Sequence, residues 1–96
     1  MKRDAIVIRD GDNVATALAV LEQKKAAKVG IEDQIVTVAL VNDIDFGHKF
    51  AITDISRGQD IIKYGEVIGR ATEDIPVGTH AHVHNIESLR GRGDLD

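Results

Sequence analysis

The chain repeats one short motif three times: Asp43-Ile44-Asp45-Phe46-Gly47, Asp54-Ile55-Ser56-Arg57-Gly58 and Asp74-Ile75-Pro76-Val77-Gly78. In each copy the isoleucine can anchor a turn in the core, the glycine can take a positive φ, and the aspartate can accept hydrogen bonds from nearby backbone amides. The copies begin 11 and then 20 residues apart, which is too irregular for a solenoid. We therefore predict a compact, pseudo-symmetric fold of short strands joined by related turns.

The composition favours a mainly β fold in one domain. Isoleucine and valine supply 22 of the 96 residues, against five leucines, and β-branched side chains pack well in pleated sheets. A chain of this length buries only about 60–65% of its surface, so we do not expect it to enclose a deep catalytic cavity alone. We place the domain at residues 1–86 and expect the polar residues 87–96 to form a mobile tail.

The signals for single elements are uneven. Residues 35–40 are typical of a strand, and residues 5–9 form a shorter aliphatic run that ends in turn-forming residues. Residues 14–28 are ambiguous, because their first part also fits a buried strand. Local propensity favours a helix there, since alanine, leucine and lysine are good helix formers and Asn13 could cap it.

Charge and missing motifs exclude several functions. The net charge is −4, from 12 basic and 16 acidic residues, so we expect no nucleic-acid partner. The chain has no cysteine, which excludes a thiolate nucleophile, and it carries no phosphate-binding loop or nucleophile elbow. Because neither a signal peptide nor an apolar span is visible, we expect a cytoplasmic protein without membrane contact.

Three of the four histidines lie in the segment His80-Ala81-His82-Val83-His84-Asn85. If this segment is an extended strand, the three imidazoles share one face and neighbouring ones lie about 6.5–7 Å apart. A pair two residues apart can then bind one metal ion at about 2.0–2.1 Å, whereas His80 and His84, about 13 Å apart, cannot share it. We expect metal or substrate contact, and an exposed polar face without a ligand is the alternative.

Two further polar clusters could contact an acidic substrate. His48 could act as a general acid or base or as a metal ligand, and Lys49 could hold an anion. Lys63 or Tyr64 could bind a carboxylate or donate a proton, and Gly65 indicates a tight bend. The alternatives are exposed turn residues in the first cluster and an ordinary Lys–Glu pair in the second.

The run from Gly47 to Gly69 closely resembles the N-terminal SAF domain of altronate and galactarate dehydratases. Its Gly-His-Lys and Lys-Tyr-Gly-x-x-Ile-Gly elements are followed by His-x-His-Asn at residues 82–85, and residues 74–85 look most like the altronate branch. Residues 12–15 also fit the sequence pattern of this family. SAF domains adopt a β-clip fold, a small contorted sheet of short strands. The resemblance implies a strand for the first half of residues 14–28 and leaves residues 24–28 open.

The resemblance also implies a function in sugar-acid metabolism. The chain would be the small subunit or N-terminal domain of a hydro-lyase, with altronate dehydratase as the first candidate. Together with a large subunit it would remove water from a 2,3-dihydroxy acid, and we expect the chain alone to be inactive. A small subunit of sulfolactate sulfo-lyase is the alternative. The family implies a divalent metal, and we expect iron(II). The expected roles are metal binding by His82 and His84, catalysis by His48, Lys49 and Tyr64, and substrate binding by Lys63 and Asn85.

Other readings of the same resemblance stay open. Related SAF modules without catalytic activity act in binding and assembly. The chain could also be a positioning subunit whose large partner carries every catalytic group. Self-association into a homo-oligomer is open as well.

Overall fold

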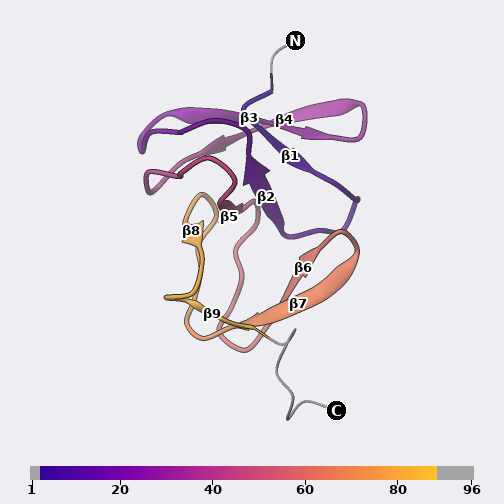
Figure 1. Ribbon diagram of the computed structural model, residues 1–96, viewed down its shortest axis with the longest axis vertical. Coiled ribbons are helices and arrows are strands. Elements are labelled where there is room, and N and C mark those ends of the chain that lie inside the picture. The colour runs from indigo at the N-terminus through magenta and orange to yellow at the C-terminus, as the bar shows by residue number, and fades with distance from the viewer. Residues whose placement is uncertain (1–2, 89–96) are drawn as a thin grey trace.

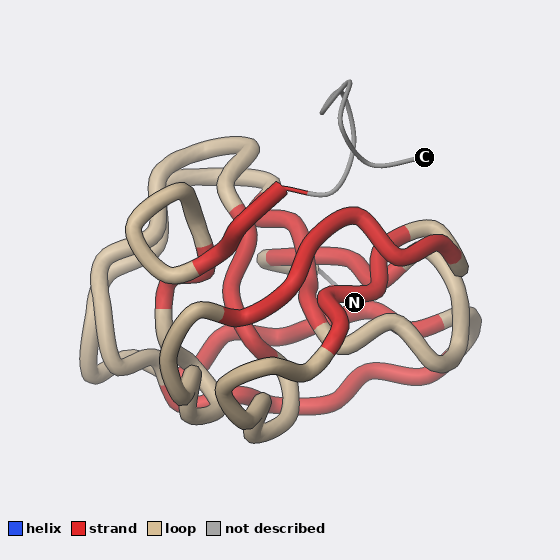
Figure 2. Tube along the Cα trace, turned by 90° about the horizontal axis from the view of Figure 1, so that it is seen from below, coloured by secondary structure: helices blue, strands red, loops and turns tan. Residues whose placement is uncertain are grey.

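The computed structural model describes residues 3–88, which form nine short strands and no helix (Figure 1). The strands are β1 (Ala5–Val7), β2 (Val14–Ala17), β3 (Ala26–Ile31), β4 (Gln34–Ala39), β5 (Lys49–Ala51), β6 (Asp60–Lys63), β7 (Glu66–Ala71), β8 (His80–Ala81) and β9 (Ile86–Ser88). The predicted mainly β class is confirmed, and short strands alternate with long turns as in a β-clip (Figure 2). The described residues include no helix that could span a membrane.

The strands form two sheets. The larger has the order β4-β3-β1-β2-β5-β8, in which only β1 and β3 run parallel, and the smaller has the order β6-β7-β9. Figure 1 shows the β3–β4 hairpin at one end of the molecule and the smaller sheet at the other. Strands β5 and β8 lie between them, so residues at their ends can meet residues of the smaller sheet.

Each sheet covers its own hydrophobic cluster. The larger sheet packs around Phe50, which is fully buried together with Val29 and Ile44. The second cluster lies between β2, β5 and the smaller sheet and contains Ile61 and Ile75. Buried aliphatic side chains therefore hold both sheets, as the content of β-branched residues predicts.

The three predicted motif copies form equivalent turns. The isoleucines of all three are buried, and the three glycines have φ angles between 80° and 89°. The second and third turns pair with each other through reciprocal contacts. Asp54 Oδ1 accepts a hydrogen bond from Val77 N, and Asp74 Oδ1 accepts one from Arg57 N, both at 2.9 Å. The aspartates therefore join one turn to the next, which adds a nonlocal contact to the predicted local role.

A fourth turn of the same kind was not predicted. Residues 20–24 replace the motif aspartate by Val20 and the glycine by Lys24, whose φ is 68°. Leu21 takes the place of the isoleucine and pairs with Ile44 of the first turn. Asp43 Oδ1 caps Gln23 N at 2.9 Å. The fold thus contains two pairs of turns, and the fourth copy is recognisable only from its backbone.

The structure corrects the helix that local propensity favours for residues 14–28. Residues 14–17 form β2, and residues 26–31 form β3, with the fourth turn between them. Packing explains the difference, because β2 is paired on both sides and its valine and alanines are buried. Strand β9 runs to Ser88, so two residues beyond the expected domain end at 86 belong to the smaller sheet. The rest of the expected tail, residues 89–96, lies outside the described residues.

Candidate functional site

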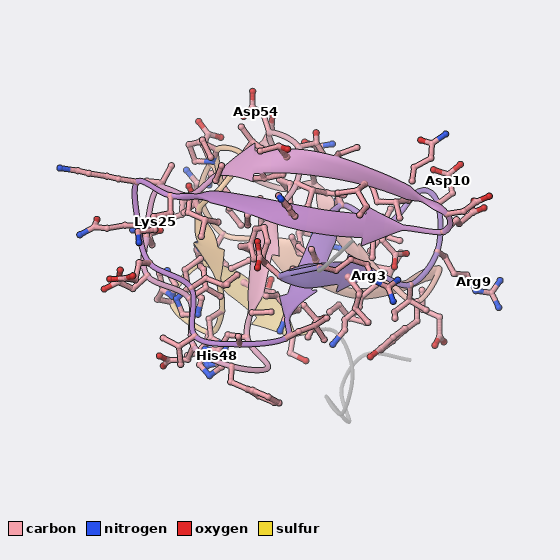
Figure 3. The ribbon with its side chains drawn as sticks, turned by 90° about the horizontal axis from the view of Figure 1, so that it is seen from above. Arg3, Arg9, Asp10, Lys25, His48 and Asp54 are labelled. Atoms are coloured by element: carbon pink, nitrogen blue, oxygen red, sulfur yellow. The ribbon has the colours of Figure 1, made fainter. Side chains whose placement is uncertain are left out.

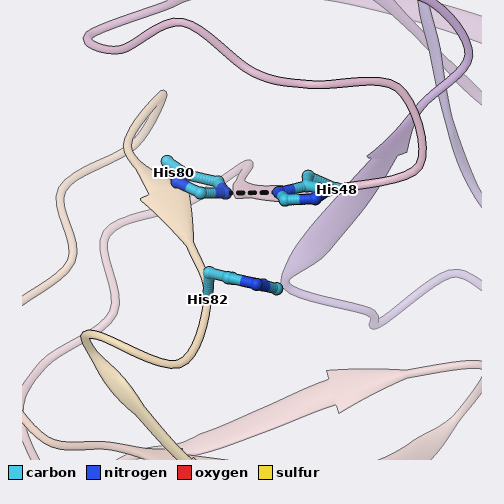
Figure 4. Close-up of side chains that lie close together, drawn as sticks. All are labelled: His48, His80 and His82. Carbon is cyan, nitrogen blue, oxygen red and sulfur yellow. Dashed lines mark hydrogen bonds between the residues drawn. The ribbon is translucent and has the colours of Figure 1, made fainter.

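Three histidines form a compact group. One ring nitrogen from each of His48, His80 and His82 lies within 4.8 Å of the other two. His48 Nδ1 and His80 Nε2 are 3.0 Å apart, at hydrogen-bonding distance (Figure 4). All three rings are stacked, with centroids 4.5–5.3 Å apart. We call these residues the histidine group.

Pairing between β5 and β8 brings the group together. His48 follows the positive-φ glycine of the first turn and directly precedes β5, and its backbone carbonyl accepts a hydrogen bond from Ala17 N at 2.9 Å. His80 begins β8 and lies opposite Phe50 in the register. Thus residues 32 positions apart in the sequence lie side by side because two short strands share a ladder.

The prediction of one extended strand over residues 80–85 is wrong. Strand β8 ends at Ala81, and the next residues form a turn in which Asn85 N and Ile86 N both donate to His82 O, at 3.0 and 2.9 Å. The turn brings the rings of His80 and His84 to 5.3 Å, well below the 13 Å of a straight strand. His82 joins His48 and His80, whereas His84, its predicted partner in metal binding, is not in that group.

Asn85 closes this turn from inside. Its side chain is only 1% exposed. Oδ1 accepts a hydrogen bond from His82 N and Nδ2 donates one to His80 O, both at 2.9 Å. Both ends of the amide are therefore used to hold the backbone of two histidines, and the predicted contact with substrate has no direct counterpart in this geometry.

A cleft of about 290 Å³ adjoins the histidine group. Residues from both sheets line it: Lys49, Lys63, Tyr64, Ile68, His82, Val83, Ile86 and Ser88. Lys63 Nζ lies 4.8 Å from the centre of the Tyr64 ring. The lysines and the tyrosine that the sequence singles out are therefore brought together, beside His82. Two lysine side chains and a phenol in one small cleft are suited to binding a carboxylate.

The Tyr64 side of the cleft depends on a residue to which the sequence analysis gave no role. Asp12 is buried, and its carboxylate accepts hydrogen bonds from Tyr64 N and Gly65 N at 2.9 Å and from Arg9 N at 3.2 Å. Tyr64 and Gly65 both have positive φ and form the two-residue turn between β6 and β7. Asp12 therefore holds this turn, and the local signal was its place in a turn-forming run at residues 10–13.

The electrostatic environment favours neutral forms of three groups. Burial, followed by the charges of His48, His82 and His84, lowers the pKa of His80 below its ordinary value. Burial, then His48, Lys49 and His84, lower the pKa of His82 in the same direction. For Lys49, burial and then the charge of Lys63 lower the pKa of the ammonium group. Neutral imidazole is the form that binds metals, and a lowered pKa leaves more of a lysine as the free amine, the form that can accept a proton.

The histidine group fits a divalent transition metal. Two nitrogens bound to one ion at about 2.1 Å and at right angles lie about 3.0 Å apart, which matches the separation between His48 and His80. His82 lies close enough to be the third ligand after a small ring movement. Imidazole donors suit iron, zinc, nickel and copper, so the donor set accepts iron(II) without selecting it.

Comparison with known proteins identifies relatives of the whole described region. The family described as the altronate/galactarate dehydratase SAF domain matches residues 3–89. Altronate dehydratase of Escherichia coli (strain K12) is 47% identical over 85 residues, which are 88% of this chain and 16% of that protein. Altronate dehydratase of Bacillus subtilis (strain 168) is 36% identical over 83 residues, 86% of this chain and again 16% of that protein.

A third relative has a different length. The (2R)-sulfolactate sulfo-lyase subunit alpha of Chromohalobacter salexigens is 34% identical over 89 residues, which cover 88% of this chain and 94% of that subunit. The chain thus spans about a sixth of the altronate dehydratases and nearly all of this subunit.

Proposed function

Because the chain belongs to the altronate/galactarate dehydratase SAF domain family, we propose that it is the SAF domain of a lyase that eliminates a group β to a carboxylate. The first candidate reaction is the removal of water from a 2,3-dihydroxy sugar acid such as altronate. The observation that carries the proposal is the cleft in which Lys49, Lys63 and Tyr64 lie next to the histidine group.

The reaction sets three chemical demands. The proton on the carbon next to the carboxylate is weakly acidic, hydroxide is a poor leaving group, and negative charge develops on the carboxylate oxygens. A base, an acid and a source of positive charge must therefore surround one small substrate. The cleft holds candidates for each of these roles within about 290 Å³.

In the proposed mechanism, Lys63 binds the substrate carboxylate and the neutral amine of Lys49 takes the proton from the adjacent carbon. The electron pair of the broken C–H bond forms the carbon–carbon double bond as the C–O bond at the next carbon breaks. Tyr64 gives its phenolic proton to the departing hydroxide, which leaves as water. The enol product then takes up a proton at carbon, loses the proton of its hydroxyl group and becomes the 2-keto-3-deoxy acid. The lowered pKa of Lys49 supports the choice of base.

We assign metal binding to His48, His80 and His82 in place of the pair His82 and His84. When bound, a divalent ion such as iron(II) would supply positive charge near the substrate carboxylate and the leaving oxygen. His82 belongs to both the histidine group and the cleft lining, so an ion held by the three side chains would adjoin the cleft. Asn85 positions the backbone of two of them.

A large catalytic partner completes the proposed site. The cleft is open, and the rim residue Val83 is 83% exposed, while Phe46, two residues before His48, is 70% exposed. Exposed apolar side chains at and near a small open cleft are typical of a surface that another protein covers. The altronate dehydratases supply more than four-fifths of their length outside the region matched here, which is the source we propose for that cover.

The test is to co-express the chain with its genomic neighbour and to assay the complex on altronate and on sulfolactate, with and without iron(II). We expect Lys49→Met and His48→Ala to reduce kcat severely while the complex stays assembled. Lys28→Met, an exposed lysine on β3, is the matched control and should leave turnover unchanged. Full activity of both Lys49→Met and His48→Ala would move the catalytic groups to the partner and reject these assignments.

The small subunit of a sulfolactate sulfo-lyase is the second candidate. The match over 94% of the subunit alpha of C. salexigens supports it, because nearly all of that subunit aligns with this chain. The leaving group would be sulfite in place of hydroxide, and the same carboxylate-binding cleft would serve both reactions. Activity on sulfolactate but not altronate in the assay above would select this alternative.

A further inference from the structure

Strand β4 has an unusual free edge. It is the outermost strand of the larger sheet, and within residues 3–88 no other strand pairs with its second edge. Its sequence, Gln34-Ile35-Val36-Thr37-Val38-Ala39, has no charge, proline or glycine, and its register with β3 is continuous over all six pairs. Natural edge strands usually avoid pairing by carrying charges, prolines or bulges. None of these devices protects β4.

The direction of the backbone groups along this edge follows from the ladder. Leu40 N donates a hydrogen bond to Lys25 O, and this bond fixes which residue pairs of the β3–β4 hairpin are hydrogen-bonded and which are not. Val36 and Val38 then belong to the hydrogen-bonded pairs with β3, whereas Ile35 and Thr37 turn their N–H and C=O groups away from β3. Ala39 is the next residue whose backbone groups point away from β3, and its carbonyl oxygen lies against Gly78. The accessible edge is therefore centred on Val36, which is 38% exposed.

Charges at the two ends of the hairpin are opposite in sign. The turn that begins β4 contains Glu32 and Asp33, both exposed. The other end carries Lys24 and Lys25, also exposed, although Lys25 contacts Glu22 of its own chain at 3.4 Å. Figure 3 shows Lys25 at one end of the hairpin and Asp10 near the other. An antiparallel neighbour would bring unlike ends together, whereas a parallel neighbour would bring like ends together.

We propose that two copies of the chain associate through antiparallel pairing of their β4 strands, with Val36 facing Val36 at the two-fold axis. In this register Ile35 of each copy lies opposite Thr37 of the other, and each such pair exchanges both of its N–H···O bonds. The strand that pairs with this edge belongs to a second copy of the chain, because in this orientation the acidic end of each hairpin lies beside the basic end of the other. The interface is small, so association is weak.

Amide hydrogen exchange tests the register directly. As the concentration of the chain rises from about 10 μM to about 1 mM, the amides of Ile35 and Thr37 should become at least several-fold better protected. The amide of Val36 already donates within the hairpin, so its protection should not depend on concentration. In sedimentation equilibrium, the apparent mass should rise from 10.4 kDa toward twice that value. A single 10.4 kDa species over this range, or equal protection changes at all three amides, overturns the proposal.

Charge substitutions at Val36 separate this interface from nonspecific association. Val36→Lys and Val36→Glu should each abolish dimerisation, because they place like charges opposite each other at the axis. An equimolar mixture of the two variants should restore it. Val67→Lys is the matched control, since Val67 is also an exposed valine of a six-residue strand, 43% exposed, but lies on β7. Dimerisation that survives Val36→Lys, or that Val67→Lys removes equally, contradicts the β4 interface.

Discussion

Replacing Asn85 by alanine should weaken both the fold and the binding of metal. The substitution removes the acceptor for His82 N and the donor to His80 O in a side chain that is only 1% exposed. Leaving two buried backbone groups without partners costs about 1–3 kcal/mol each, and partial access of water favours the lower half of that range. We therefore expect a loss of about 2–4 kcal/mol. With an m-value of about 1–1.5 kcal/mol/M for a small domain, the urea midpoint falls by about 2 M.

The second effect of Asn85→Ala is on the histidine group. Residues that orient metal ligands typically contribute about 10–100-fold in affinity, and Asn85 fixes the backbone on both sides of Ala81. A Co²⁺ titration followed by visible absorbance should show weaker binding by that factor under conditions in which the variant is still folded. Asn13→Ala is the matched control, because its amide also spans two backbone groups, Asp60 O and Ile62 N, away from the histidines. It should lose stability with unchanged Co²⁺ affinity.

Two outcomes would refute this reasoning. If Asn85→Ala loses stability but binds Co²⁺ as tightly as the unaltered chain, Asn85 does not position the histidines. If the unaltered chain itself does not bind Co²⁺, the assignment of the histidine group as a metal site fails.

Two further predictions concern the turns and the titration of the site. Gly78→Ala should destabilise the domain by more than about 3 kcal/mol, because a Cβ there would lie 2.0 Å from Ala39 O. Gly58 has a similar φ and nothing within 4 Å of such a Cβ, so Gly58→Ala should cost only about 1 kcal/mol. Equal losses of stability in urea unfolding would contradict the steric argument. Folding lowers the pKa values of His80 and His82 from the ordinary value of 6.5. Near and below that pH the unfolded chain therefore binds more protons than the folded one, and the free energy of unfolding should fall from pH 7.5 to pH 5.5. Replacing both histidines by asparagine should flatten this slope in urea unfolding, and an unchanged slope would assign it to other groups.

The turn motifs show which parts of the fold the sequence makes visible. Three turns were predictable, because aspartate, isoleucine and glycine each have a local physical reason to occupy their positions. The fourth was not, since Val20 and Lys24 carry no turn signal and Lys24 takes a positive φ only because the surrounding pairs hold it there. The same holds for β2, whose helix-forming residues are extended because two neighbouring strands pair with them.

The candidate site was predictable in composition but not in arrangement. Histidines two residues apart suggested an extended strand, and no proline or glycine between His80 and Asn85 signalled a turn. The turn depends on the buried amide of Asn85, which is a tertiary feature. The grouping of His48 with His80 likewise depends on the pairing of β5 with β8, which no local pattern encodes. The sequence indicated Lys49, Lys63 and Tyr64 as candidates in two separate clusters, and the structure places all three in the lining of one cleft.

The position of the cleft explains why a domain this small needs no deep cavity of its own. Lys49 lies on β5 of the larger sheet, and His82 directly follows β8 of the same sheet. Lys63 and Ser88 lie on the smaller sheet and Tyr64 in its β6–β7 turn, so the cleft lies at the junction of the two sheets. Its geometry depends on a few buried polar contacts across that junction, chiefly Asp12 with the Tyr64-Gly65 turn. Because buried carboxylate–amide bonds are strong and directional, they fix the separation of cationic groups without a large core. In the complex that we propose, the partner would cover the open side, supply the walls and exclude water without disturbing the residues that this chain holds in place.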